Sequence, residues 1–66
     1  MKITIDHQID EVINEIGMRR KVYSRSVERG VMNRADANKK IAIMEEVLKT
    51  LERVKGKVEN QTTLFQ

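Results

Sequence analysis

Apolar residues recur every three or four positions in two separate parts of the chain, a spacing that places side chains on one face of an α-helix. The first part covers residues 5–29, and its apolar positions are Ile5, Ile9, Val12, Ile13, Ile16, Tyr23 and Val27. The chain has no proline and almost no aromatic residues, which also favours helix over strand. We expect this helix to begin at Thr4 or Asp6, because both are good N-caps.

The second part covers residues 34–55 and predicts a second helix. Its apolar residues repeat at steps of four and three, at Ala37, Ile41, Met44, Leu48 and Leu51. A neighbouring stripe consists of Ile43, Val47 and Val54. Asn33 is expected to cap this helix, with Asp36 completing a capping box. We expect Gly56 to end the helix and residues 57–66 to form a flexible C-terminal tail.

The connection between the two helices is short and contains Gly30. A glycine here suits the left-handed position of a Schellman turn, and Val31 suits the hydrophobic contact that follows it. A turn of this length folds the helices back as an antiparallel hairpin. Facing residues then have numbers that add up to about 63, which sets Ile16 beside Val47 and Ile13 near Leu51.

The predicted fold is therefore all-α, with a two-helix hairpin over residues 1–56. Sixty-six residues form one domain whose core is too small to be stable without help. The two stripes on the second helix make an apolar face wider than one facing helix covers. We expect two hairpins to pack as a homodimeric four-helix bundle. The alternative is that this face docks a different protein.

Arg20 interrupts the apolar face of the first helix, between Ile16 and Tyr23. In one interpretation its stem packs on the neighbouring helix while its head meets Glu45 or Glu46. In the other, Arg20 and Glu46 form a partly buried ion pair that fixes the register of the hairpin.

Charge is high but nearly balanced, with 13 basic and 10 acidic residues and a net charge of +3. This balance is typical of a solvated surface rather than of a polyanion-binding one. Candidate contacts to nucleic acid or to a partner are Arg19, Lys21, Arg25 and Arg29. A DNA-reading helix–turn–helix domain normally needs a third helix, and the aromatic residues of single-strand binders are missing. A nucleic-acid site is therefore the less favoured interpretation.

Residue types that support catalysis are scarce. The chain has no cysteine and one histidine, so it offers no disulfide and no cysteine- or histidine-based zinc site. It has no nucleophile–base pair at a plausible spacing and no glycine-rich phosphate loop. We therefore expect a protein that is not an enzyme and has no cofactor. No apolar run reaches membrane-spanning length and no signal-peptide pattern is present, so we expect a cytoplasmic protein without a membrane partner.

The middle of the chain carries an extended pattern. Glu15, Met18, Arg19, Val22 and Tyr23 follow the form Glu-x-x-Met-Arg-x-x-Val-Tyr, and a Gly turn and an Ile-x-x-Met helix come after it. Over roughly residues 15–48, this pattern resembles a family of short, mostly uncharacterised phage and prophage proteins. Ser24 stands where that family usually has proline, so the helix here is expected to run straighter. The resemblance implies a phage setting, and hence the host bacterial cytoplasm, but no activity.

The chain ends Gln61-Thr62-Thr63-Leu64-Phe65-Gln66. This segment resembles the peptide with which many bacterial and phage proteins bind the DNA polymerase sliding clamp, although Thr62 stands where leucine is commonest. In such peptides the Leu-Phe pair fills an apolar pocket and the Gln hydrogen-bonds beside it, while the peptide is extended. The resemblance implies clamp binding through Gln61, Leu64 and Phe65, and a role in modulating host replication. The alternatives are a tail folded back onto the helices, a disordered tail, and a remnant of a protease tag, which Thr62 and Thr63 do not fit.

Two further functions stay open. One is a small inhibitor of a host or defence protein that docks through the helical face. The other is a dimeric DNA-binding protein, whose affinity would fall steeply with salt. Removal of residues 61–66 separates them from clamp binding, because neither needs the tail.

Overall fold

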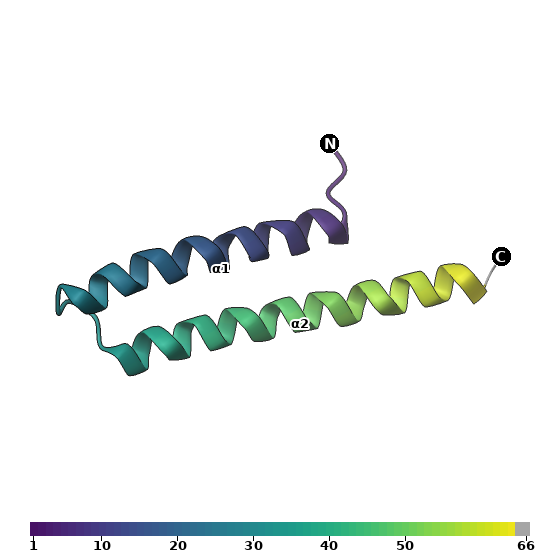
Figure 1. The fold of residues 1–66 in the computed structure, drawn as a ribbon. Coiled ribbons are helices and arrows are strands. Elements are labelled where there is room, and N and C mark those ends of the chain that lie inside the picture. The colour runs from purple at the N-terminus through teal and green to yellow at the C-terminus, as the bar shows by residue number, and fades with distance from the viewer. Residues whose placement is uncertain (65–66) are drawn as a thin grey trace.

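The computed structural model describes residues 1–64, with side chains described up to residue 58. The described chain consists of two helices, α1 (Ile5–Glu28) and α2 (Arg34–Leu64), and contains no strand. The helices run antiparallel and side by side, joined by a short turn at one end (Figure 1). The prediction of an all-helical hairpin is confirmed.

The start of α1 is fixed by a reciprocal pair of hydrogen bonds. The backbone N–H of His7 donates to the hydroxyl of Thr4, and the backbone N–H of Thr4 donates to Nδ1 of His7, both at 3.2 Å. Thr4 is therefore the N-cap, and His7 takes the place that Glu or Gln holds in most capping boxes. The sequence predicted Thr4 or Asp6 as the cap but gave His7 no role.

The turn after α1 is the predicted Schellman motif. Gly30 has φ = +75°, a left-handed conformation that costs glycine nothing. The N–H of Val31 donates to the carbonyl of Ser26, and the N–H of Gly30 donates to that of Val27, each at 3.0 Å. The expected hydrophobic closure does not form, because Val31 remains 76% exposed. The turn is thus held by its backbone hydrogen bonds.

Helix α2 begins after Asn33, as predicted, but ends later. The side-chain oxygen of Asn33 accepts a hydrogen bond from the backbone N–H of Ala35 at 2.7 Å. The expected stop at Gly56 is wrong, because α2 continues through this residue to Leu64. Lys55 Nζ lies 2.8 Å from Asp6 Oδ1, so α2 still faces α1 at this level. One glycine inside a helix costs only about 1 kcal/mol relative to alanine, so Gly56 weakens α2 here without ending it.

Two ion pairs across the hairpin define its register. Arg20 pairs with Glu45 and Asp6 pairs with Lys55, so the residue numbers add up to 65 and 61. These values lie on either side of the 63 predicted from the turn. The register is therefore confirmed, although Val47 and Ile13 lie at the edges of the seam, where they stay 41% and 50% exposed.

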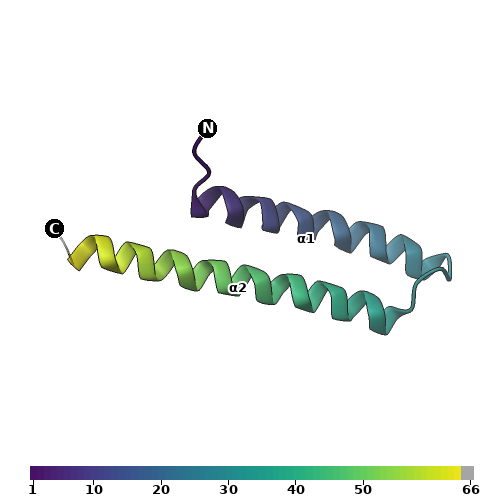
Figure 2. The ribbon, with the colours of Figure 1, turned by 180° about the vertical axis from the view of Figure 1, so that it is seen from behind.

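The hairpin is a single layer of helices. Its principal extents are 55 × 25 × 12 Å, and the smallest of these is the diameter of one helix with side chains. Only Ile16 and Ala37 are buried among the residues with described side chains. Figure 2 shows the same layer from behind, with α2 extending past the start of α1. Most domains bury their core between two layers, so this chain presents half of such an arrangement.

Candidate functional site

The most conspicuous surface feature is a row of exposed aliphatic side chains along α2, here called the apolar stripe. It consists of Ile43, Val47, Val54 and Val58, whose exposed fractions lie between 41% and 54%. The spacing of four, seven and four residues places them along one side of the helix. A solvated helix face rarely carries four β-branched residues in line, so the stripe is a candidate interface.

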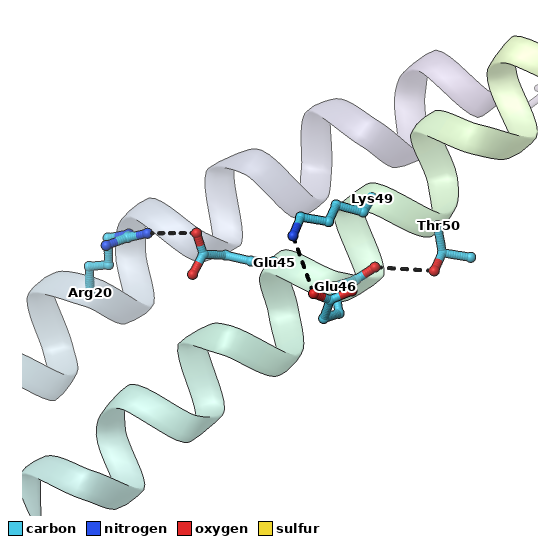
Figure 3. A network of polar contacts seen from close by, with 5 residues as sticks. All are labelled: Arg20, Glu45, Glu46, Lys49 and Thr50. Carbon is cyan, nitrogen blue, oxygen red and sulfur yellow. Dashed lines mark hydrogen bonds and ion pairs between the residues drawn. The ribbon is translucent and has the colours of Figure 1, made fainter.

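The apolar stripe lies on one face of the layer, and the Arg20–Glu45 pair lies on the other. At 100° per residue, Glu45 and Val47 fall on opposite flanks of the side of α2 that meets α1. Figure 3 shows Arg20 of α1 and Glu45 of α2 reaching toward each other across the seam. One face of the hairpin is therefore bridged by charge, while the other offers aliphatic side chains.

A polar border runs along the outer edge of the apolar stripe, away from α1. Its members are Glu46, Thr50, Arg53 and Lys57, all exposed. The hydroxyl of Thr50 donates to the backbone carbonyl of Glu46 at 3.1 Å (Figure 3). Thr50 can therefore enter an interface without leaving a buried hydroxyl unsatisfied. Glu46 pairs with Lys49 of its own helix, at 3.3 Å and in an exposed position.

The opposite face holds an open groove of about 540 Å³ near the turn. Its rim is polar and includes Arg20, Arg34 and Glu45, and its floor is formed by Val27, Ala37 and Ile41. The ion pair between Arg20 and Glu45 occupies part of the rim. The expected alternative pairing of Arg20 with Glu46 is wrong, because Glu46 lies on the far side of α2 from the seam.

The basic residues of α1 do not form one patch. The Nε atom of Arg19 lies 3.2 Å from Oε2 of Glu15. Hydrogen bonds to Glu15 and then to Tyr23 raise the pKa of Arg19 above its ordinary value. Lys21, Arg25 and Arg29 are exposed, and their spacing of four residues aligns them along the outer side of the helix. Arg19 is thus already engaged, which leaves a smaller basic row than the sequence suggested.

The predicted clamp-binding residues lie at the C-terminal end of the chain. Gln61 and Leu64 belong to the last turns of α2, and Phe65 lies outside the described residues. By the register, α1 begins opposite residues 56–60 of α2, so Gln61 and Leu64 have no part of α1 beside them. This end of α2 projects past the hairpin in Figure 1.

The described part of the chain has neither a metal-binding cluster nor a membrane-spanning helix. No group of three or more His, Cys, Asp or Glu side chains there has the arrangement of a metal site. None of the described helices is long and apolar enough to cross a membrane. No protein-family model, curated protein or solved structure matches the chain. The resemblances noted in the sequence therefore rest on their residues alone.

Proposed function

We propose that this chain is a small interaction protein that binds the bacterial sliding clamp through Gln61, Leu64 and Phe65. The proposal is supported by the position of this peptide at the end of α2, which extends past the start of α1 (Figure 1). A short recognition peptide must be reachable from all sides, and a segment beyond the hairpin satisfies that requirement.

Binding in the extended form requires the last turns of α2 to unwind. By the register, α1 begins opposite residues 56–60, so the last turns of α2 lie beyond it and their unwinding breaks intrahelical hydrogen bonds. Terminal turns of helices fray readily, so the free-energy cost is small compared with burial of a Leu-Phe pair, which is worth roughly 3 to 6 kcal/mol. The helical body then acts as a carrier that holds the peptide at the clamp.

Calorimetry with a purified bacterial sliding clamp tests this function. Binding should reach micromolar affinity with the full chain and fall at least tenfold for Leu64→Ala/Phe65→Ala. Asn60→Ala is the matched control, because it changes a neighbouring residue outside the motif. Unchanged affinity of the double variant, or no binding by the full chain, excludes this function.

The helical body itself is proposed to form a homodimer with four helices. A layer one helix thick with two buried residues leaves little apolar burial to offset the conformational entropy of folding. The apolar stripe supplies the missing contact area when a second hairpin packs on it. A phage origin and a bacterial cytoplasmic setting, which the sequence pattern suggests, fit a protein of this size that targets replication.

A further inference from the structure

The dimensions of the chain indicate what covers the apolar stripe. The accessible surface is 5586 Å², whereas a compact monomer of 7.7 kDa exposes about 4,300 Å². The radius of gyration is 16.0 Å, against about 11 Å for a compact domain of this length. A standard interface buries about 800 Å² on each partner. The hairpin therefore has enough excess surface for one interface of ordinary size.

The edge of α1 beside the apolar stripe is too polar to be the main partner of a second stripe. It carries the Glu15–Arg19 ion pair, whose side chains are 38% and 43% exposed. Stacking a stripe on this edge would remove both charges from water for little apolar gain. Stacking one stripe on the other buries two aliphatic rows at once.

The polar border fixes the relative direction of the two helices. Along α2 it runs from the acidic Glu46 through Thr50 to the basic Arg53 and Lys57. In a parallel pair related by two-fold symmetry, the two polar borders lie on opposite sides of the interface, so their charges do not meet. In an antiparallel pair centred near Thr50, Glu46 of one chain lies across from Arg53 and Lys57 of the other. The antiparallel arrangement also opposes the two helix dipoles.

We propose that two copies of this chain pair through antiparallel α2 helices, stripe against stripe, with the two-fold axis near Thr50. This inference rests on the self-association proposed above and specifies its interface and direction. Ile43 and Val47 of one copy then pack on Val58 and Val54 of the other. The ends of the two α2 helices leave the dimer in opposite directions, about 40 Å apart at 1.5 Å per residue. The two C-terminal peptides are thereby directed toward separate partners.

Single cysteines test this arrangement, because the chain has none of its own. Three exposed positions are used in the full-length protein: Thr50→Cys at the proposed axis, Lys39→Cys three turns earlier on the same side of α2, and Met18→Cys on the outer side of α1. Disulfide-linked dimers are measured on non-reducing gels after mild oxidation, with sedimentation of the reduced variants in parallel. Since a disulfide needs Cα atoms within about 7 Å, only Thr50→Cys should cross-link efficiently.

Each contrary outcome has a distinct meaning. Equal cross-linking of Lys39→Cys and Thr50→Cys overturns the antiparallel arrangement, because a two-fold axis at Thr50 holds the two copies of residue 39 about 33 Å apart along the helices. A Thr50→Cys variant that sediments as a dimer but does not cross-link overturns the proposed interface, because the copies then pair in the parallel direction or through a different face. A monomer in sedimentation overturns self-association itself. Clamp binding by the C-terminal peptide is measured separately by calorimetry, and its result does not depend on whether the chain forms this dimer.

Discussion

Arg20 of α1 and Glu45 of α2 form an ion pair across the hairpin, with Nη2 3.3 Å from Oε2. Both side chains are about half exposed, at 56% and 49%, so water and salt weaken their attraction. The pair therefore marks the register of the hairpin without contributing much to its stability.

A double-mutant cycle on Arg20→Ala and Glu45→Ala should give a coupling free energy of about 0.2–1 kcal/mol. The coupling is obtained from urea unfolding of the wild type, both single variants and the double variant. It should shrink in 1 M salt, where exposed charges are screened over about 3 Å. A coupling above 2 kcal/mol that ignores salt would mean that the pair is desolvated.

Gly56 should be replaceable by alanine with a gain in stability. It lies inside α2, and a Cβ atom built there meets nothing within 4 Å. Gly56→Ala should raise the free energy of unfolding by about 0.5–1 kcal/mol, because alanine favours helix. Gly30→Ala is the contrasting control and should destabilise by about 1 kcal/mol, since its φ of +75° strains any residue with a Cβ. Thermal unfolding followed by circular dichroism measures both; a loss of stability in Gly56→Ala contradicts a helical Gly56.

His7 should stabilise α1 through its hydrogen bond from the backbone of Thr4. Thr4→Ala should cost about 1 kcal/mol, and His7→Ala a smaller amount of about 0.5 kcal/mol. His7→Gln is the matched control, because glutamine can accept the same hydrogen bond in a capping box. Equal losses in the alanine and glutamine variants, measured by urea unfolding, would show that the reciprocal bond contributes nothing.

A charge reversal tests the polar border of the proposed dimer. Glu46→Lys alone places like charges across the antiparallel interface and should weaken self-association several-fold. Glu46→Lys/Arg53→Glu exchanges the two signs and should restore most of the affinity. Analytical ultracentrifugation across a concentration series gives the dissociation constants. If the single variant associates as tightly as the wild type, these charges do not face each other.

Local sequence rules predicted much of this fold because they act over a few residues. The helical periodicity and the left-handed Gly30 each depend only on neighbouring positions, and the structure has both. The predicted end of α2 at Gly56 is too early, because a single glycine costs only about 1 kcal/mol in a helix and does not by itself end it. His7 was missed because histidine is an unusual residue at that position of a capping box.

The candidate sites were predicted less completely. The surplus of apolar residues on the second helix was visible from their spacing, and it corresponds to the exposed stripe. The basic cluster was overestimated, because Glu15 engages Arg19 one helical turn away. Phe65 lies outside the described residues, so the clamp peptide rests on its sequence and on the position of the end of α2.

Sedimentation equilibrium of the full chain is the most direct test of the idea that this single-layer hairpin completes its core with a second copy. A dimer of two 7.7 kDa chains is expected, with a mass of about 15 kDa at micromolar concentration. Val47→Lys should shift it toward the monomer, whereas Met18→Lys, on the far side of α1, should not. A well-folded wild-type protein that sediments at 7.7 kDa across the whole concentration range would contradict the account.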